Sequence, residues 1–514
     1  MIRRSLKWSL IYVAEALAII LLIGIFAGGA ALWRLSQGPV SLDLFRDDAQ
    51  RMLAESFEGD LVSLGRLDVR FDRDSQLIFL RATDITVAES GGVVIARAPV
   101  IEAGLALDSL IFGRFEPVMV HVEGGIVSLV RREDGAVGAS LGPPDRVALT
   151  ARPPGSALDS DALLELLRDP ARAPILGRLR HLSISETSVH VRDAVNGFSW
   201  LIDNAGLDVS RNANSLRASL NGEFVTTAGL APVRVRVEAG SDLNSLLMEV
   251  EARNLWPRAL APFSGPYAGL GALDAPITLD LFASATRGEG VRAAEMVLDV
   301  GDGHVRLGTE DLPFQGAALR LGYDPELGEI RLTEGQVRSD LFSSAFSGRI
   351  HEMRGFEDAF PRRWRYDFEL TDGRIDIPDA FDAPPEWSRI AVSGSADASS
   401  RTSEFDSLEL DIGNISARLT GDMALRQVED GRWLPDLRLT GPISGQIGPR
   451  EVLAYWPVEL ADGARDWVVE HVISGRMQNA NLDLDLNAES IVAGVLPNDR
   501  LSLSFDFVDA NFHY

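Results

Sequence analysis

The sequence contains no cysteine, and its only lysine is Lys7. The absence of cysteine excludes disulfides, zinc ribbons, iron–sulfur clusters and thiol catalysis, and it fits any compartment, an oxidising one included. Positive charge is also scarce, because 49 Lys and Arg residues face 75 Asp and Glu residues. The formal net charge of −26 would repel phosphate backbones, so we expect no nucleic-acid partner.

Signatures of catalysis and cofactor binding are missing as well. The chain has no phosphate-binding P-loop, no GxSxG nucleophile elbow and no HExxH motif. Its histidines are scattered along the chain, at positions 121, 181, 190, 304, 351, 471 and 513. Asp483 and Asp485 could mimic a carboxylate pair or a calcium site, but acids alternate on many strands here, so solvation explains them better. We expect no enzyme activity, no cofactor and no metal.

Charge is nearly absent from one long stretch near the N-terminus. Between Trp8 and Trp33 only Glu15 is charged, and residues 16–33 form an uncharged run of eighteen. At 1.5 Å per helical residue, eighteen residues span about 27 Å and the whole stretch about 39 Å, enough to cross a hydrocarbon core of about 30 Å. We therefore predict a transmembrane anchor over residues 8–33.

The flanks of this anchor predict its orientation. Arg3, Arg4 and Lys7 precede it, and without them the chain has 46 basic against 75 acidic residues, a charge of −29. The positive-inside bias therefore places the N-terminus in the cytoplasm and exports the rest of this single-pass protein. Trp8 and Trp33 stand near the two ends of the stretch, where aromatic rings favour the membrane interface.

A cleaved signal peptide is the competing interpretation of the same stretch. Small residues at 27–31 resemble a peptidase site. The apolar run, however, exceeds the usual signal core of 7–15 residues, so an uncleaved anchor is the better interpretation.

Beyond the anchor the hydrophobic period changes from helical to strand-like. Residues 42–57 predict a short amphipathic helix, after which the period becomes 2, typical of half-buried strands. Each such run presents one apolar face and one wet, often charged face. The apolar positions of the clearest runs are Val118, Val120, Val122, Val233, Val235, Val237, Ile277, Leu279, Leu281, Leu408, Leu410, Ile412, Leu482, Leu484, Leu486, Leu501, Leu503, Phe505 and Phe507.

Turn signals recur between these runs. They are Asp134-Gly135, Asn196-Gly197, Asn221-Gly222, Gly301-Asp302-Gly303, Asp372-Gly373, Gly421-Asp422 and Asp430-Gly431. Because such residues permit the positive φ of hairpin turns, we predict about 25–30 mainly antiparallel strands. Helical patterns are few and do not alternate with the strands, which disfavours a parallel α/β fold. They are predicted over residues 159–168, after Trp256-Pro257, over 449–455 and over 462–473.

The apolar face shared by these strands must be shielded from water, and too few helices are predicted to cover it. A second sheet, closure into a barrel, or an open trough that binds a hydrophobic ligand would each shield this face. Periodicity alone leaves sandwich and trough open. Arg362-Arg363-Trp364-Arg365, the only compact basic cluster, is interpreted as a charged strand edge that discourages aggregation.

Several segments resemble the AsmA-like proteins of Gram-negative bacteria. After the anchor these are Gly38-Pro39-Val40-Ser41-Leu42, residues 98–105, Leu110-Ile111-Phe112-Gly113, residues 118–120, and residues 125–131 with Asp134-Gly135. Later, Tyr455-Trp456-Pro457, residues 461–469 and Ile473-Ser474-Gly475 are similar to the YhdP-type branch of that family.

The resemblance implies a mainly β fold, in which an N-terminal transmembrane helix precedes an elongated, curled antiparallel β-sheet groove, or rod, with a few short helices. It implies a periplasmic body anchored in the inner membrane, related to the bridge-like lipid transfer proteins, that helps transport phospholipids between inner and outer membranes. The apolar strand positions given above would line the groove and hold phospholipid acyl chains. The alternative is a non-transporting envelope scaffold or outer-membrane assembly factor made of β-sandwich units.

The resemblance also implies an organisation along the chain. This is a cytoplasmic tail (1–7), the anchor (8–33), an N-terminal AsmA-like unit (34–141), a Pro-rich linker with a short helix (142–174) and a repetitive β-groove body (175–514). Members of this branch commonly run longer, so we expect either a short molecule or an incomplete portion ending at Tyr514. An open last strand there would offer an edge to an outer-membrane or periplasmic protein partner.

Overall fold

The computed structural model shows a mainly β chain with few helices. It describes residues 29–56, 61–88, 94–111, 116–133, 137–140, 178–195, 197–240, 242–261, 268–307, 310–352, 363–428, 433–458, 462–493, 497 and 499–513. Contacts divide the chain into two compact units. Unit 1 comprises Met1–Val225 and Arg236–Leu243, and unit 2 comprises Thr226–Val235 and Asn244–Tyr514.

The predicted anchor lies mostly outside the described residues, as do Arg3, Arg4, Lys7 and Trp8. Residues 29–35 are helical, and Trp33 among them is 63% exposed. Among the helices that the structure describes, none combines the length and apolarity needed to cross a membrane.

Unit 1 is a sheet with short helices at its start. Its elements are β1 (Val40–Ser41), η1 (Asp43–Phe45), α2 (Arg46–Ser56), β2 (Leu61–Ser63), β3 (Leu67–Asp72), β4 (Leu77–Ala88), β5 (Val94–Ala106), α3 (Leu107–Ile111), β6 (Pro117–Glu123), β7 (Ile126–Arg131), β8 (Val137–Ser140), β9 (His181–Asp193), β10 (Phe198–Arg211) and β11 (Ser215–Thr226). The helix predicted over residues 42–57 is confirmed as η1 followed by α2, whereas α3 was not predicted.

Among the described residues of unit 1, strand pairing is antiparallel except at β9. β9 runs parallel to β6 along its first half and parallel to β7 along its second half. A parallel neighbour requires a long crossover connection, and the chain between β7 and β9 supplies one. The prediction of mainly antiparallel strands is therefore confirmed, with β9 as the departure from it.

Unit 2 is an open, curled antiparallel sheet with short helices. Its elements are β13 (Ser245–Leu255), α5 (Pro257–Leu260), η4 (Ala268–Ala272), β14 (Leu273–Asp274), β15 (Ile277–Thr286), β16 (Gly290–Val300), β17 (Gly303–Leu307), β18 (Glu310–Asp324), β19 (Glu329–Ser339), β20 (Phe342–His351), β21 (Arg363–Ile375), β22 (Glu386–Asp397), β23 (Thr402–Ile412), β24 (Ile415–Gln427), β25 (Trp433–Ile447), α6 (Pro449–Tyr455), α7 (Asp462–His471), β26 (Val472–Leu486), α8 (Ala488–Ala493) and β27 (Leu501–Phe512). The division between the units falls within β12 (Gly229–Gly240).

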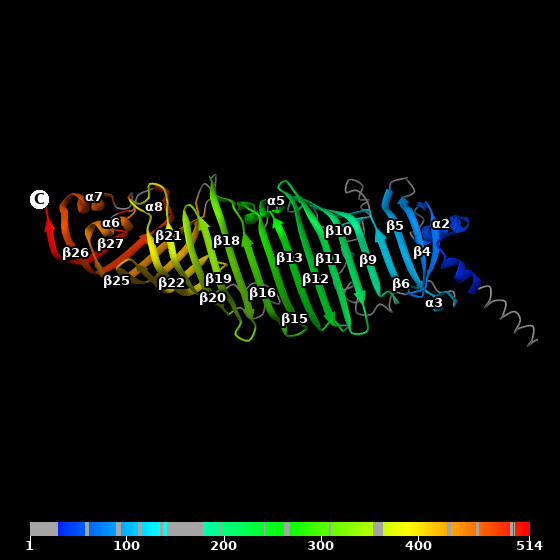
Figure 1. Ribbon diagram of the computed structural model, residues 1–514. Coiled ribbons are helices and arrows are strands. Elements are labelled where there is room, and N and C mark those ends of the chain that lie inside the picture. The colour runs from blue at the N-terminus through cyan, green and yellow to red at the C-terminus, as the bar shows by residue number, and fades with distance from the viewer. Residues whose placement is uncertain are drawn as a thin grey trace, which may run out of the picture. The chain divides into compact units, whose positions relative to one another are not determined.

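From β15 to β27, successive long strands of unit 2 pair in chain order. β13 pairs with β15, β15 with β16, and β16 with β18, after which each strand pairs with the next as far as β27. The short strands β14 and β17 pair with each other, and β17 also pairs with one end of β18. Figure 1 shows β18, β19, β20, β21 and β22 side by side, with α6, α7 and α8 near β25, β26 and β27.

Three of the predicted turns are wrong, because they lie inside long strands. Asn221-Gly222 lies within β11, Asp372-Gly373 within β21 and Gly421-Asp422 within β24. A Cβ at Gly373 would come 2.0 Å from the ring of Trp387, and one at Gly421 would come 1.8 Å from the carbonyl oxygen of Arg438. These glycines serve close cross-strand packing, a use that sequence spacing does not distinguish from a turn.

The other predicted turns have different outcomes. Gly197, with φ +71°, lies in the hairpin between β9 and β10, as predicted. Gly301-Asp302-Gly303 connects β16 to β17, but these two strands are not paired, so it is a turn without a hairpin. Asp134-Gly135, Asp430-Gly431 and Asn196 lie outside the described residues.

The predicted helices of unit 2 are confirmed in position. α5 follows Trp256, and α6 has the predicted bounds. α7 ends two residues earlier than predicted, because Val472 and Ile473 already belong to β26. Gly475, predicted to end this helix, instead lies in β26 with φ +138° against Ala510 of β27. The helix predicted over residues 159–168 lies outside the described residues, and α8 was not predicted.

Candidate functional site

All nineteen apolar strand positions singled out from the sequence are half-buried in the structure. None of them is fully buried, and none is exposed. In β12, for example, Val233 and Val235 are half-buried while the intervening Arg234 is exposed. A fully covered sheet face would bury such side chains completely, so this intermediate exposure is typical of an apolar face without a second sheet upon it.

Cross-strand register assembles apolar side chains of unit 2 into continuous rows. One row passes through Val250, Leu281, Met296, Leu321, Leu332, Gly348, Phe368, Val392, Leu408 and Leu419. On the last three strands Gly441 faces Leu482, and Leu482 faces Leu503. A Cβ at Gly441 would lie 3.1 Å from Cα of Leu419, so the two parts of the row meet there.

The remaining predicted positions fall on neighbouring rows or in other parts of the sheet. On unit 2, Leu279 faces Leu298, Leu410 faces Ile390 and Ala417, Ile277 faces Val300, and Ile412 faces Ile415; Leu484 faces Leu439 and Leu501, Leu486 faces Leu437, and Phe507 faces Met477. On unit 1, Val120 faces Leu182 and Val122 faces Ile184. Val118 lies at a register shift between β5 and β6.

The apolar face of unit 2 is hollowed near its last strands by a pocket of about 240 Å³. The lining residues are Ile415, Ile443, Ser444, Gly445, Ile447, Val452, Tyr455, Trp456, Pro457, Met477, Gln478, Ala480, Leu482, Leu501, Leu503 and Phe505. The sequence reasoning identified four of them, Leu482, Leu501, Leu503 and Phe505. It missed the side chains from β24, β25 and α6, although the apolar Tyr455-Trp456-Pro457 segment after a short helix was a usable signal.

Helix α6 and the residues Trp456 and Pro457 after it roof this pocket, and α6 and α7 together are called the cap below. Pro449 begins α6, and the backbone N–H of Gly448 before it donates to the Glu451 carboxylate at 3.0 Å. Beyond α6, the backbone N–H of Val458 donates to the carbonyl of Ala380 at 2.9 Å, in the connection between β21 and β22. The cap therefore reaches from β26 to a loop several strands away.

An ion pair between α7 and the same loop adds to this attachment. Arg465 of α7 contacts the carboxylate of Asp382, and the Arg465 side chain is only 10% exposed. Nε of Arg465 is buried and has no partner within the part of the chain that the structure describes. Asp382 is 58% exposed, and its negative charge balances the positive charge of the nearly buried Arg465 side chain.

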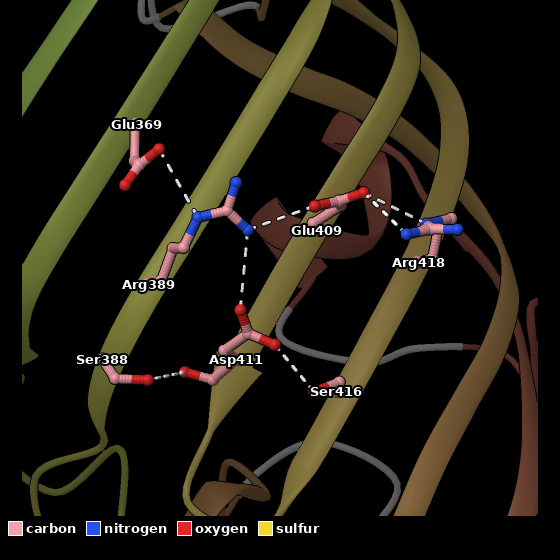
Figure 2. Close-up of polar contacts among 7 residues, drawn as sticks. All are labelled: Glu369, Ser388, Arg389, Glu409, Asp411, Ser416 and Arg418. Atoms are coloured by element: carbon pink, nitrogen blue, oxygen red, sulfur yellow. Dashed lines mark hydrogen bonds and ion pairs between the residues drawn. The ribbon is translucent and has the colours of Figure 1, made fainter.

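The opposite face of the sheet carries a network of ion pairs, which Figure 2 shows. Arg389 of β22 reaches Glu369 at 3.4 Å, Glu409 at 3.1 Å and Asp411 at 3.6 Å. Arg418 approaches Glu409 from the other side at 2.9 Å. The hydrogen bond from Arg389 and the charge of Arg418 lower the pKa of the Glu409 carboxyl below its usual value. Ion-pairing and solvation are the roles that this arrangement supports.

Other groups that could have carried chemistry are also engaged in ion pairs. Asp485 pairs with Arg438 at 3.7 Å and with Arg500 at 3.3 Å, which makes it part of a charged strand face. His351 lies between Glu329 at 3.0 Å and Asp367 at 2.6 Å. Among the described residues, no cluster of three or more His, Asp or Glu side chains could hold a metal ion.

The basic cluster at the start of β21 is neutralised by neighbouring strands. Arg363 pairs with Asp397 at 2.7 Å, and Arg365 pairs with Asp406 at 3.1 Å. Hydrogen bonds from Ser399 and Arg363 lower the pKa of the Asp397 carboxyl. Arg362 lies outside the described residues. The two described arginines of the cluster therefore contribute to the wet face of the sheet.

Comparisons with known proteins give no family assignment. No protein-family model, no curated protein and no solved structure matches the chain.

Proposed function

We propose that the chain is a lipid-binding protein of the AsmA-like type, which holds phospholipid acyl chains along the open apolar face of its sheet. The carrying observation is the row of aliphatic and aromatic side chains that continues strand after strand through unit 2, most of them at intermediate burial and two, Leu332 and Leu419, buried. Acyl chains are the biological ligands that such a long, uncharged and continuous surface fits best.

The energetics of such a surface favour holding a lipid while letting it slide. Burial of a methylene contributes about 0.8 kcal/mol, so a chain with many buried methylenes is held firmly. Neighbouring positions of the row offer similar aliphatic contacts, so a displaced chain loses little of this energy. The headgroup stays in water, because a charged group moved onto the apolar face would lose its hydration without gaining a partner.

In this proposal the body is periplasmic and residues 8–33 anchor it in the inner membrane. The protein would help move phospholipids between the inner and outer membranes, without enzymatic activity or a cofactor. The resemblance to AsmA-like proteins supports this location. The uncharged N-terminal stretch and the three positive residues before it support the same orientation.

A charged belt across the apolar face tests the proposal. Leu298 and Leu319 face each other on β16 and β18, on the row beside the one described above. The double variant Leu298→Asp and Leu319→Asp forces an acyl chain to contact two carboxylates, which is costly to desolvate. We expect the full chain, reconstituted in vesicles, to lose most of its transfer of fluorescent phospholipid to acceptor vesicles.

The matched control places two aspartates on the same strands but on the wet face. Val297→Asp and Ala318→Asp meet this requirement, since Val297 faces Arg320 and Ala318 faces Asp299. This control should retain transfer. Equal transfer by both double variants would refute the groove, and a purified protein free of phospholipid by mass spectrometry would favour the scaffold alternative.

A further inference from the structure

We propose that the pocket beneath the cap is a terminal site that receives the methyl end of a single acyl chain. This inference deepens the proposed function and rests on it, because it assigns one place on the apolar face to one end of the ligand. The pocket differs from the rest of the face in having a roof.

The walls of the pocket come from two directions. The sheet supplies a floor that includes Ile443, Leu482 and Leu503, and the cap supplies Val452 and Trp456 from above. A chain end inside would therefore contact protein on several sides, whereas a chain on the open row contacts protein on one side. Burial on several sides roughly completes the transfer of each methylene out of water, so the end of the chain is held more tightly here.

The pocket lining has no charged side chain that could bind a lipid headgroup. Two of the lining side chains with polar groups, Ser444 and Gln478, already make hydrogen bonds. Ser444 donates its hydroxyl to the carbonyl of Ser416 at 3.0 Å, and Gln478 accepts from Gln446 at 3.0 Å. A phosphate or an amine placed here would lose its hydration without gaining a charged partner, a penalty that a terminal methyl group does not incur.

The size and position of the pocket fit one chain end. An apolar cavity of about 150 Å³ already stays dry and accepts a benzene-sized guest, and this pocket measures about 240 Å³. Leu482 and Leu503 belong both to the pocket and to the continuous row, so a chain lying along the row would enter the pocket end-on. The proposed occupant is therefore the last carbons of one acyl chain, with its headgroup outside.

Photocrosslinking of the full chain tests the site directly. The probe is phosphatidylethanolamine with a diazirine at the methyl end of one acyl chain, and the matched probe has the diazirine beside the ester. After illumination, mass spectrometry should find the methyl-end probe on peptides containing residues 443–457, 477–482 and 501–505. The ester-side probe should label these peptides several-fold less.

Two variants fill the pocket from opposite sides. Ala480→Trp adds an indole from the floor, and Val452→Trp adds one from the roof. Ala317→Trp is the control, since Ala317 faces Val300 on the apolar face of β18 outside the pocket. Both filling variants should lose pocket labelling several-fold while the control keeps it. Circular dichroism and thermal unfolding identify a variant that has not folded. If one filling variant fails to fold, the labelling of the other shows whether filling the pocket removes the chain end.

The outcomes separate this inference from the function on which it rests. Labelling on the other strands of the row but not in the pocket would overturn the terminal site and leave lipid binding standing. Equal pocket labelling by the two probes, or labelling unchanged by both filling variants, would likewise overturn the methyl-end assignment. No labelling anywhere on the apolar face would overturn both proposals.

Discussion

Glycines on the apolar face of unit 2 lie beneath aromatic rings from neighbouring strands. A Cβ at Gly335 would come 2.5 Å from the ring of Phe346, and a Cβ at Gly348 would come 2.3 Å from the ring of Phe368. Each aromatic ring packs over the backbone of the glycine, which has no side chain of its own to cover it. Such glycine–aromatic pairs stabilise a curved sheet. Because no side chain separates the strands there, the sheet can bend without opening a gap.

The substitution Gly348→Ala should destabilise the protein for this reason. Its methyl group would also come 2.4 Å from the backbone oxygen of Asp367, which cannot rotate away. Overpacking of this kind costs about 1–3 kcal/mol. Gly322→Ala is the matched control, because a Cβ there meets nothing within 4 Å. Urea unfolding should show a lowered midpoint for the first variant only; an equal midpoint in both would contradict the close packing.

Alternation in the sequence predicted which strand residues share a face, but not how the strands align. Leu408 and Leu410 could be assigned to one face because side chains alternate along a strand. Their partners Val392 and Ile390 depend on bulges and on connection lengths, which alternation does not encode. The pocket was missed for the same reason, since its side chains meet only once register and cap are in place.

The cap is the element whose attachment matters most for the proposed terminal site. Arg465 is nearly buried, and its charge is balanced by Asp382 at the loop. Breaking a buried ion pair by removing one partner leaves an uncompensated charge. The exposure of Asp382 moderates this penalty, since water screens its side of the pair.

Asp382→Asn should therefore loosen the cap without unfolding the sheet. We expect a loss on the order of 1–2 kcal/mol, which corresponds to roughly a 5–30-fold fall in the amide protection of α6 and α7. Hydrogen exchange read by mass spectrometry measures this on peptides from residues 449–458 and 462–471. Asp379→Asn, in the same loop, is the control and should change nothing; a fall in protection spread evenly over β22 to β25 would contradict a local attachment.

At the scale of elements, helices were predicted better than turns. α6 was found because Pro449 and the following apolar residues mark a helix start. The turn prediction failed at Asp372-Gly373 because residues with positive φ occur in β-bulges as well as in turns. Asp372 has φ +49° near a register shift between β20 and β21. Asn479 likewise has φ +53° at a register shift within β26. Bulges of this kind bend and twist a strand without ending it.

For the whole molecule, the period-2 alternation along the chain predicted the mainly β class and the polar, acidic face. Many acids pair with arginines across neighbouring strands, as Glu409 does with Arg389, and the excess of acidic over basic residues gives the net charge of −26. Composition could not predict that the apolar face of unit 2 would lack a second sheet among the described residues. Sandwich and open sheet have the same alternation, and they differ only in whether a second sheet packs on the apolar face.

The net charge should govern how the molecule approaches membranes. Outside its first seven residues the chain has a charge of −29, so an anionic vesicle repels it over roughly a Debye length, which shrinks from about 30 Å at 0.01 M salt to about 8 Å at 0.15 M. We expect added salt to speed lipid transfer from the reconstituted full chain into phosphatidylglycerol-containing acceptor vesicles. Transfer into phosphatidylcholine acceptors, which carry no net charge, should change little over the same range. Equal acceleration for both acceptors would show that salt acts on the protein or on lipid release, and that the acidic surface does not control the encounter.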